Sequence, residues 1–310
     1  MDTDSLPVPD PVFSLGDLES RDFPGTALAV LGHPIRHSLS PAMHSAALAE
    51  MARARPAFAS WRYHRFDVPP DDLPRALDLL RLRGFHGLNL TVPHKVIAFD
   101  LVAEIDPAAR PIGAVNTLLR LAHGWRGYNT DGAGLGRGVS DDLGSPLAGA
   151  HVVLLGAGGA ARAAAVECLR RRCASLWIAN RTPARLDALL ARLRPLAGQT
   201  PVHGFEPGAP PSGLPAGALV INATTAGLRP DDPPPIDLAR LPRPAGVYDM
   251  IYNPPETPLL RQASLLGVPH ANGLSMLVHQ GAQSLEIWTG ETVPVAAMMS
   301  AARAARSRPA

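Results

Sequence analysis

The sequence predicts an α/β protein made of two successive domains. At 310 residues the chain is long enough for two hydrophobic cores, since one domain usually takes roughly 100–200 residues. Short apolar runs alternate with helical stretches along both halves of the chain, a rhythm typical of parallel sheets flanked by helices. In the second half an apolar run leads directly into a glycine-rich turn and an alanine-rich helix, which indicates a nucleotide-binding sheet.

The individual elements follow from apolar periodicity and from the prolines and glycines between the runs. In the first half we predict strands at residues 27–32, 63–68 and 87–91, and helices at 41–51 and 73–83. In the second half we predict strands at 151–155, 175–179, 218–223 and 246–250, and helices at 160–172 and 183–194. Two stretches rich in proline and glycine, 204–217 and 229–235, are predicted to be surface loops.

Composition and charge exclude several classes of protein. With 46% hydrophobic and 18% charged residues, the chain has no apolar run as long as a membrane span needs. The net charge of +2 comes without a basic stripe, so nucleic acid is not an expected partner. Cys168 and Cys173 suit neither a disulfide framework nor a zinc site. The acidic, proline-bearing first two dozen residues match no secretory or transit peptide and are expected to be a loose extension of a cytoplasmic protein.

Lys95 is the only lysine among the 29 lysine and arginine residues. Arginine can replace lysine at most surface positions, but a guanidinium stays protonated at any working pH, so it cannot replace a compact donor that must release a proton. Lys95 is therefore the first candidate for catalysis. Coding bias that removed the other lysines and left one by chance is the alternative.

The most specific generic motif is the strand His151-Val-Val-Leu-Leu155 followed by Gly156-Ala157-Gly158-Gly159-Ala160-Ala161. Gly156 permits a tight turn, Gly158 lets the backbone approach a pyrophosphate, and a small residue at the third position allows the helix to pack closely on the strand. The phosphates then lie at the helix N-terminus. Because the glycines follow a strand and precede a helix, the motif predicts a Rossmann-like dinucleotide site.

The cofactor is predicted to be NADP. The next strand ends at Asn180-Arg181-Thr182, where an NAD enzyme usually places a carboxylate for the ribose hydroxyls. Arg181, with Arg185, can instead pair with a 2′-phosphate, which a carboxylate would repel. An exposed arginine at a helix start is the alternative interpretation of Arg181.

Several separated motifs in a shared order make the chain resemble the shikimate dehydrogenase family from Thr26 to about residue 290. They are Gly32-His-Pro-Ile-Arg-His-Ser38-Leu-Ser40-Pro41, Asn89-Leu-Thr91-Val-Pro-His-Lys95, Gly113-Ala-Val-Asn116-Thr117, Tyr128-Asn-Thr-Asp131-Gly132, Asn222-Ala-Thr224, Tyr248-Asp-Met250-Ile-Tyr252 and Asn272-Gly273-Leu-Ser-Met276-Leu-Val-His-Gln280. Ser275 and Thr225 replace residues that the family often has at these positions, glycine and serine.

The resemblance implies a flexible extension over 1–25, a substrate domain over 26–128 plus 274–310, and an NADP-binding Rossmann-like domain over 129–273, with the active site in the cleft between them. It implies that Lys95 and Asp131 are the catalytic pair, which also contacts the substrate. The other implied substrate contacts are Ser38, Ser40, Asn89, Thr91, Asn116, Tyr252 and Gln280. The cofactor contacts are Gly156, Ala157, Gly158, Gly159, Ala160, Asn180, Arg181, Thr182, Arg185, Thr224, Met250 and Gly273.

The chemistry of these side chains suits the implied roles. Ser38 and Ser40 are two residues apart, so on an extended segment both hydroxyls would face one way and, with Tyr252, could hold a carboxylate. The alternative for Ser40 is that it caps the helix beginning at Pro41. The neutral amides and Thr91 suit ring hydroxyls, although any one of them could brace a loop instead. Met250 could fill the core rather than contact the nicotinamide.

The implied reaction is the reversible reduction of 3-dehydroshikimate to shikimate with NADPH, in which Lys95 donates to the developing alkoxide and Asp131 orients the ammonium without a metal. None of His33, His37, His94 and His279 has convincing metal-ligand spacing, so we expect packing or supporting roles for them. A quinate/shikimate dehydrogenase that prefers NAD, a non-catalytic NADP-sensing regulator and an enzyme for an aminated analogue are the alternatives. The expected partner is a small molecule, and the expected assembly is a monomer or a homodimer.

Overall fold

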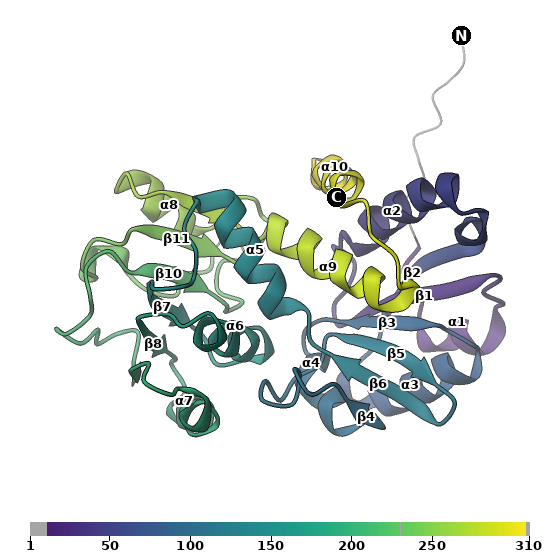
Figure 1. Cartoon of the computed structure of the whole chain (residues 1–310), viewed down its shortest axis with the longest axis horizontal. Helices are drawn as coiled ribbons and strands as arrows, with labels where there is room; N and C mark the ends of the chain where they lie inside the picture. Colours follow the sequence, from purple (N-terminus) through teal and green to yellow (C-terminus); the bar gives the residue numbers. More distant parts are fainter. Residues whose placement is uncertain (1–10, 230, 308–310) are drawn as a thin grey trace, which may run out of the picture.

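The computed structural model describes residues 11–229 and 231–307, which form two six-stranded sheets flanked by helices. The two sheets lie at opposite ends of an elongated molecule, with helices α5 (Asp131–Leu143) and α9 (Leu274–Thr289) running side by side between them (Figure 1). No helix in the described part of the chain is long and apolar enough to span a membrane. The predicted α/β class is confirmed.

The first sheet has the strand order β2-β1-β3-β5-β6-β4. Its strands are β1 (Thr26–Gly32), β2 (Trp61–Asp67), β3 (Gly87–Leu90), β4 (Glu104–Ile105), β5 (Thr117–Leu121) and β6 (Gly124–Tyr128), and its helices are α2 (Ser40–Ala54), α3 (Leu73–Leu82), α4 (His94–Ile97) and α10 (Val295–Arg306). Strands β1, β2 and β3 are parallel, whereas β5 pairs antiparallel with both β3 and β6. The alternation of strands and helices predicted parallel sheets, and the β5–β6 hairpin, which was not predicted, departs from this: its tight connection has no Asn-Gly or Gly-Gly pair to mark it in the sequence.

The second sheet is fully parallel and has the order β12-β11-β10-β7-β8-β9. Its strands are β7 (His151–Leu155), β8 (Ser175–Ala179), β9 (Val202–Phe205), β10 (Leu219–Asn222), β11 (Gly246–Asp249) and β12 (His270–Asn272), with helices α6 (Gly159–Arg170), α7 (Pro183–Leu193) and α8 (Pro258–Leu265). The chain winds outward from β7 in one direction and then from β10 in the other. The glycine turn after β7 therefore lies at the point where the strand order reverses, which is where doubly wound sheets bind ligands.

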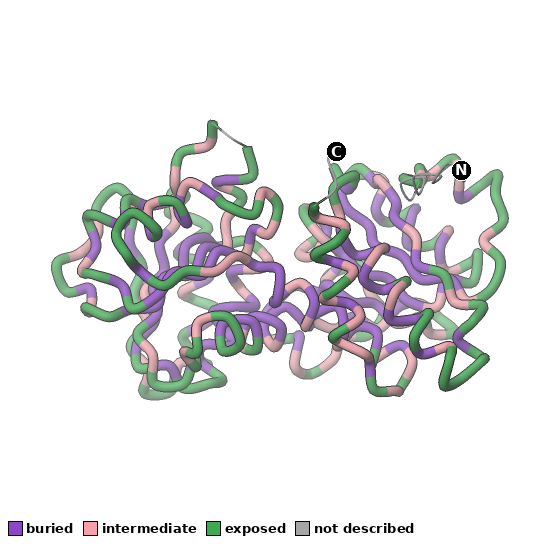
Figure 2. The backbone as a smooth tube through the Cα atoms, turned by 90° about the horizontal axis from the view of Figure 1, so that it is seen from above, coloured by how far each residue is buried: buried purple, intermediate pink, exposed green. Residues whose placement is uncertain are grey.

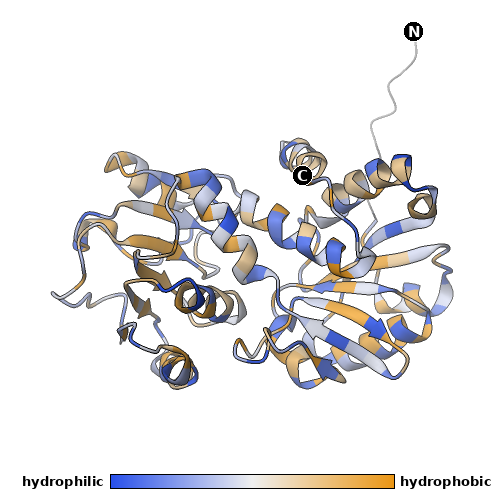
Figure 3. Ribbon diagram, viewed as in Figure 1, coloured by the Kyte–Doolittle hydropathy of each residue, from blue (hydrophilic) through white to orange (hydrophobic). Residues whose placement is uncertain are grey.

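The central strands β1 and β3 of the first sheet and β7, β10 and β11 of the second are buried on both faces, since alternate residues of a strand point to opposite sides and nearly all of them are buried. In β7, Val152 and Leu154 pack with α5, α6 and α7, whereas Val153 and Leu155 pack with α8 and the segment leading to it. Buried residues follow the strands of both sheets (Figure 2), and the strands of the second sheet are hydrophobic along most of their length (Figure 3). These two-sided cores leave the carboxyl ends of the strands as the place for polar chemistry.

Two expectations for irregular segments need correction. Residues 11–25 are not a loose extension: helix α1 (Leu15–Ser20) begins with a capping box between Ser14 and Asp17, and its Leu18 is fully buried. Residues 1–10 lie outside the described part of the chain. The predicted loop over 204–217 overlaps β9, which pairs with β8 and takes in the first two residues of that stretch.

Helices α5 and α9 pack unusually closely because glycine faces the contact. A Cβ atom placed on Gly134 would lie 2.7 Å from Cβ of Gln280 and 2.9 Å from its backbone nitrogen, and one on Gly138 would lie 2.8 Å from the nitrogen of Met276. Such distances are shorter than van der Waals contact, so only glycine fits. The close contact brings Gln280 of α9 next to Asp131 at the start of α5.

Candidate active site

Lys95 and Asp131 form an ion pair where the two halves of the molecule meet. Lys95 lies in the short helix α4 that follows β3, and Asp131 is the first residue of α5. Lys95 Nζ lies 2.6 Å from Asp131 Oδ2, and the side chains are 16% and 3% exposed. The carboxylate is thus almost enclosed at a helix N-terminus, which favours its negative charge, while the ammonium keeps access to a ligand.

Asn116 connects Asp131 to α9. Its Nδ2 donates to Asp131 Oδ1 at 2.9 Å and to Gln280 Oε1 at 3.1 Å, and its Oδ1 accepts from the backbone N–H of Thr130 at 2.8 Å. The predicted substrate contacts Asn116 and Gln280 therefore share one hydrogen-bond network with the predicted catalytic pair. Thr130, which the sequence analysis did not single out, completes this network.

Asn89 is held by residues that the sequence analysis missed. Its Nδ2 donates to Ser284 Oγ at 3.0 Å and to Thr117 Oγ1 at 3.2 Å, and its Oδ1 accepts from the hydroxyl of Tyr63 at 2.7 Å. Burial raises the pKa of Tyr63, so the phenol remains a donor. Thr91 lies at the end of β3 with no hydrogen bond from its hydroxyl to the described residues, which leaves that hydroxyl available to a ligand.

The Ser38–Ser40 segment differs from the expectation. Ser40 is the first residue of α2 rather than part of an extended segment, so the predicted reason for the two hydroxyls facing one way is wrong. Ser40 makes no cap through its side chain either; instead Ser38 Oγ accepts from the backbone N–H of Ser40 at 3.3 Å. Tyr252 does lie beside this segment, bonded to the backbone of Leu39, and burial raises its pKa to about 12. The phenol therefore stays protonated as a donor.

His44 of α2 is buried beneath this segment and makes stability depend on pH. Its ring stacks on Tyr63 with 4.1 Å between the ring centroids, Nδ1 lies 2.9 Å from the carbonyl oxygen of Ser40, and burial lowers its pKa from 6.5 to about 4. Between these two values the unfolded chain binds more protons than the folded chain. The stabilisation present above pH 6.5 is therefore lost progressively as the pH falls to about 4.

We expect His44→Phe to flatten this part of the pH profile. The free energy of unfolding of the unmodified protein should fall by about 3 kcal/mol more than that of His44→Phe between neutral pH and the folded-state pKa, because phenylalanine does not titrate. Urea unfolding at a series of pH values measures both. If the free energy of unfolding fell equally with pH in the two proteins, His44 would not be the source of the pH dependence.

The glycine turn after β7 has the geometry of a phosphate cradle. Gly156 has a φ of +112°, which only glycine adopts readily, and a Cβ on Gly158 would meet nothing within 4 Å, so its backbone is open to a ligand. Gly159, followed by Ala160, begins α6 and presents the N-terminal amides. A Cβ on Gly159 would lie 3.3 Å from Cβ of Lys95, so the turn packs against the residue that carries the ammonium.

The predicted ribose-phosphate contacts follow β8. The side chains of Arg181 and Arg185 are exposed and have no hydrogen bond or ion pair with the described residues. Asn180 Nδ2 donates to the carbonyl oxygen of Thr182 at 2.9 Å and so shapes the turn. Thr182 caps α7 without a side-chain bond. Two unpartnered guanidinium groups at this place fit a 2′-phosphate.

Thr224, Met250 and Gly273 surround the carboxyl ends of β10 and β11. Thr224 Oγ1 donates to Asn222 Oδ1 at 2.7 Å, and a Cβ on Gly156 would lie 3.0 Å from Thr224 Cγ2, so this threonine borders the glycine turn. Met250 packs on the core of the second sheet and is only partly buried. A Cβ on Gly273 would lie 2.2 Å from the carbonyl oxygen of Met250, so glycine is needed there for the approach of two backbone segments.

Comparison with known proteins identifies the family. The substrate-binding domain model of shikimate dehydrogenase matches residues 30–118, and the C-terminal domain model of shikimate 5′-dehydrogenase matches residues 273–303. The shikimate dehydrogenase (NADP(+)) of Symbiobacterium thermophilum is 42% identical over 288 residues, which cover 91% of this chain and 95% of the relative. The chain belongs to the shikimate dehydrogenase family.

Solved structures of this family superpose on most of the chain. Shikimate 5-dehydrogenase from Thermus thermophilus, in complex with NADP(H) and shikimate, has a TM-score of 0.77 and 36% identity, covering 90% of this chain and 99% of its own. Quinate dehydrogenase from Corynebacterium glutamicum, in complex with NAD, also has a TM-score of 0.77, with 31% identity, and covers 90% of this chain and 99% of its own. The fold of the shikimate dehydrogenase family is thus shared with enzymes of different substrate and cofactor.

The histidines of this shikimate dehydrogenase family member lie in supporting positions. His33 Nδ1 lies 2.5 Å from Asp67 Oδ1, His279 Nε2 lies 2.7 Å from Asp141 Oδ2, and His94 is buried, which lowers its pKa. His37 is exposed. Within residues 11–229 and 231–307 no group of three or more His, Cys, Asp or Glu side chains could hold a metal ion.

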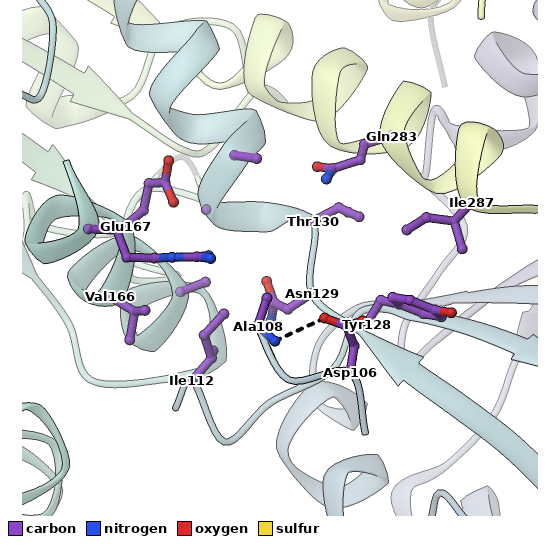
Figure 4. Close-up of a pocket in the computed structure, with 14 residues that line it drawn as sticks. Asp106, Ala108, Ile112, Tyr128, Asn129, Thr130, Val166, Glu167, Gln283 and Ile287 are labelled. Atoms are coloured by element: carbon purple, nitrogen blue, oxygen red, sulfur yellow. Dashed lines mark hydrogen bonds between the residues drawn. The ribbon is translucent and has the colours of Figure 1, made fainter. Parts of the chain in front are cut away.

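A cavity of about 170 Å³ lies at the crossing between the two halves of this family member, and its lining does not include Lys95. Tyr128, Asn129 and Thr130 of the crossing segment line it together with Glu167 of α6 and Gln283 of α9 (Figure 4). Asp131 is the next residue of the chain and starts α5. The cavity therefore borders the segment that leads to Asp131 and is separate from the side chain of Lys95.

Proposed function

We propose that this chain catalyses the reversible reduction of 3-dehydroshikimate to shikimate with NADPH, using Lys95 and Asp131. The observation that carries the proposal is the enclosed ion pair at 2.6 Å, placed against a glycine turn that fits a dinucleotide. Its position in a chain 42% identical to a shikimate dehydrogenase (NADP(+)) supports the assignment of substrate and cofactor. The activity belongs to aromatic amino acid and chorismate biosynthesis.

The mechanism follows from the charges around the reacting oxygen. Bound NADPH supplies the hydride. The Lys95 ammonium donates to the substrate carbonyl oxygen, stabilises the alkoxide as it forms and delivers the proton. Asp131 holds the ammonium in place and accepts from the neighbouring ring hydroxyl. In shikimate oxidation the same groups act in reverse, with Lys95 receiving the proton.

The remaining predicted substrate contacts bind the carboxylate and the ring hydroxyls of shikimate. Ser38, Ser40 and Tyr252 are neutral donors for the carboxylate, and Asn89, Thr91, Asn116 and Gln280 serve the ring hydroxyls. The buried network through Tyr63 and Ser284 supports this role for Asn89, because an amide held by fixed partners can present only one hydrogen-bonding pattern. A substrate that lacks a matching hydroxyl leaves a polar group unpaired and binds more weakly.

The cofactor preference is expected to depend on Arg181. We expect Arg181→Asp to raise the KM for NADP⁺ by about tenfold or more, since a charge-assisted bond to the 2′-phosphate is replaced by repulsion. Activity with NAD⁺ should be unchanged or higher. The matched control is Arg194→Asp, an exposed arginine at the end of α7. Equal losses with NADP⁺ in both variants would contradict the role of Arg181.

The experiment that tests the function compares shikimate and quinate, each with NADP⁺ and NAD⁺, by following the reduced cofactor at a pH that favours oxidation. We expect activity mainly with shikimate and NADP⁺. Activity mainly with quinate or NAD⁺ would assign the chain to the sibling enzyme, which the likeness to the NAD-bound quinate dehydrogenase keeps as the second candidate. Binding of NADP⁺ without any turnover would favour a regulator.

The proposal also covers the domain organisation, the assembly and the location of the protein. We infer a substrate domain over 26–128 plus 274–310 and an NADP domain over 129–273, a division supported by the two separate sheets and by the crossings at α5 and α9. The protein acts on a small molecule, without nucleic acid, as a monomer or a homodimer. A cytoplasmic location is supported by Cys168 and Cys173, which are free and buried.

A further inference from the structure

One loop of the substrate-binding half touches both the catalytic pair and the glycine turn. This loop, residues 113–116, lies between α4 and the first turns of α6. The N–H of Val115 donates to the carbonyl oxygen of Lys95 at 2.8 Å, and Asn129 Nδ2 donates to the carbonyl oxygen of Ala114 at 2.9 Å. Asn116 at the end of the loop bonds to Asp131. A displacement of this loop therefore moves both members of the pair.

A side chain of helix α6 in the nucleotide-binding half is also bonded to this loop. Arg162 Nη1 donates to the carbonyl oxygen of Gly113 at 3.1 Å. Arg162 lies in α6 one turn after the phosphate cradle, and its own N–H donates to the carbonyl oxygen of Gly158 at 2.9 Å. The guanidinium thus joins the loop to the helix whose first amides face the cofactor.

The surroundings of this bond show that the guanidinium is held in place. Arg162 is half-buried, and burial together with the charge of Arg192 lowers its pKa, while Asp100 opposes this change. Arg192 of α7 packs on the same glycine, since a Cβ on Gly113 would lie 2.6 Å from its guanidinium carbon. Two like charges converge on one loop residue, so the carbonyl oxygen of Gly113 is needed to keep Arg162 there.

We propose that Arg162 is a positioning residue that sets the catalytic pair relative to the bound dinucleotide through the loop 113–116. The cradle and the ammonium belong to different halves of the molecule, and hydride transfer needs the reacting carbon and the donor within near-attack distance. A Cβ placed on Gly159 would lie 3.3 Å from the Cβ of Lys95, so the cradle lies close to α4, and the bond from Arg162 ties the cradle's helix to the loop that is bonded to Lys95. Arg162 itself touches neither the substrate nor the reacting atoms.

The test rests on the proposed function, so the unmodified protein is assayed first with shikimate and NADP⁺; if it is inactive, the proposed function fails and not this inference. With an active enzyme, Arg162→Met should lower kcat by about tenfold or more. The affinity for NADP⁺, measured without substrate by cofactor fluorescence, and the KM for shikimate should change less than about threefold, since the ligand contacts remain. Arg162→Lys should recover much of kcat, because a lysine can still reach the carbonyl.

A kinetic isotope effect separates positioning from a merely structural role. With shikimate deuterated at the carbon that loses hydride, Arg162→Met should show a larger isotope effect on kcat than the unmodified enzyme, because hydride transfer becomes the slow step. Arg170→Met, an exposed arginine at the end of the same helix, should leave kcat and the isotope effect unchanged. An unchanged kcat in Arg162→Met, or a loss that parallels its thermal stability with no change in isotope effect, would overturn the proposal.

Discussion

Replacing Lys95 by methionine should lower the rate of shikimate oxidation by about 10³-fold or more, the contribution expected of a positioned general acid–base group with its charge. Methionine keeps the length and apolar stem of the side chain but can neither donate nor carry charge. The affinity for NADP⁺ should change less than about twofold, because the Lys95 atom nearest to a Cβ placed on Gly159 is its own Cβ, which methionine keeps. Initial rates and cofactor titration measure the two effects separately.

A double variant controls for folding. Lys95→Met leaves the Asp131 carboxylate 3% exposed without its cation, which should cost stability. Adding Asp131→Asn removes that charge, so thermal unfolding of the double variant should return toward that of the unmodified protein while activity stays lost. Activity of the single variant near that of the unmodified enzyme would remove Lys95 from the mechanism.

Gly134→Ala should destabilise the protein by about 2 kcal/mol, the usual cost of overpacking a close contact. The added methyl group would lie 2.9 Å from both the nitrogen of Gln280 and the carbonyl oxygen of Met276. These are backbone atoms, so α9 must move as a whole, and Gln280 moves with it. We therefore expect a higher KM for shikimate together with a lower midpoint in urea unfolding.

Gly136→Ala is the matched control in the same helix. A methyl group at this position would meet Glu167 Oε1 at an ordinary 3.4 Å and nothing closer. Because alanine favours a helix over glycine by about 0.5–1 kcal/mol, this variant should be slightly more stable and fully active. If both alanine variants behaved alike, the close contact between α5 and α9 would not be the reason for glycine at position 134.

The sequence was informative wherever local chemistry determines the structure. The strand before Gly156, the glycine turn and the helix after it appear as predicted. Hydrophobic periodicity and turn-forming residues determine the local backbone conformation over only a few positions, so they can be recognised in the sequence. The lone Lys95 was found by composition, and its partner Asp131 by the family resemblance. The capping box of Ser14 and Asp17 was a readable local signal that the prediction of a loose extension overlooked.

The features of the fold and of the site that the sequence did not predict depend on contacts between residues far apart in the chain. Tyr63 and Ser284 hold Asn89 from positions 26 and 195 residues away, and neither lies in a motif that would have singled it out. The β5–β6 hairpin has no glycine or asparagine pair in its two-residue connection, so its antiparallel pairing was invisible in the sequence. The expected extended segment at Ser38 and Ser40 was wrong because α2 begins at Ser40, and helix ends are the least certain part of any such prediction.

The path of the chain has a consequence for biosynthesis on the ribosome. Helix α2, near the start of the described chain, packs on α9 and α10 at its end, and Trp288 of α9 donates to the carbonyl oxygen of Leu118. The last strand of the second sheet, β12, is synthesised before α9 and α10, which pack against the first sheet. The second sheet can therefore form before the first sheet has all of its helices. Lys95 and Asp131 are synthesised before the second sheet, whereas Gln280 and Ser284 are synthesised after it. Nascent enzyme should therefore acquire its cofactor fold before it can recognise a substrate.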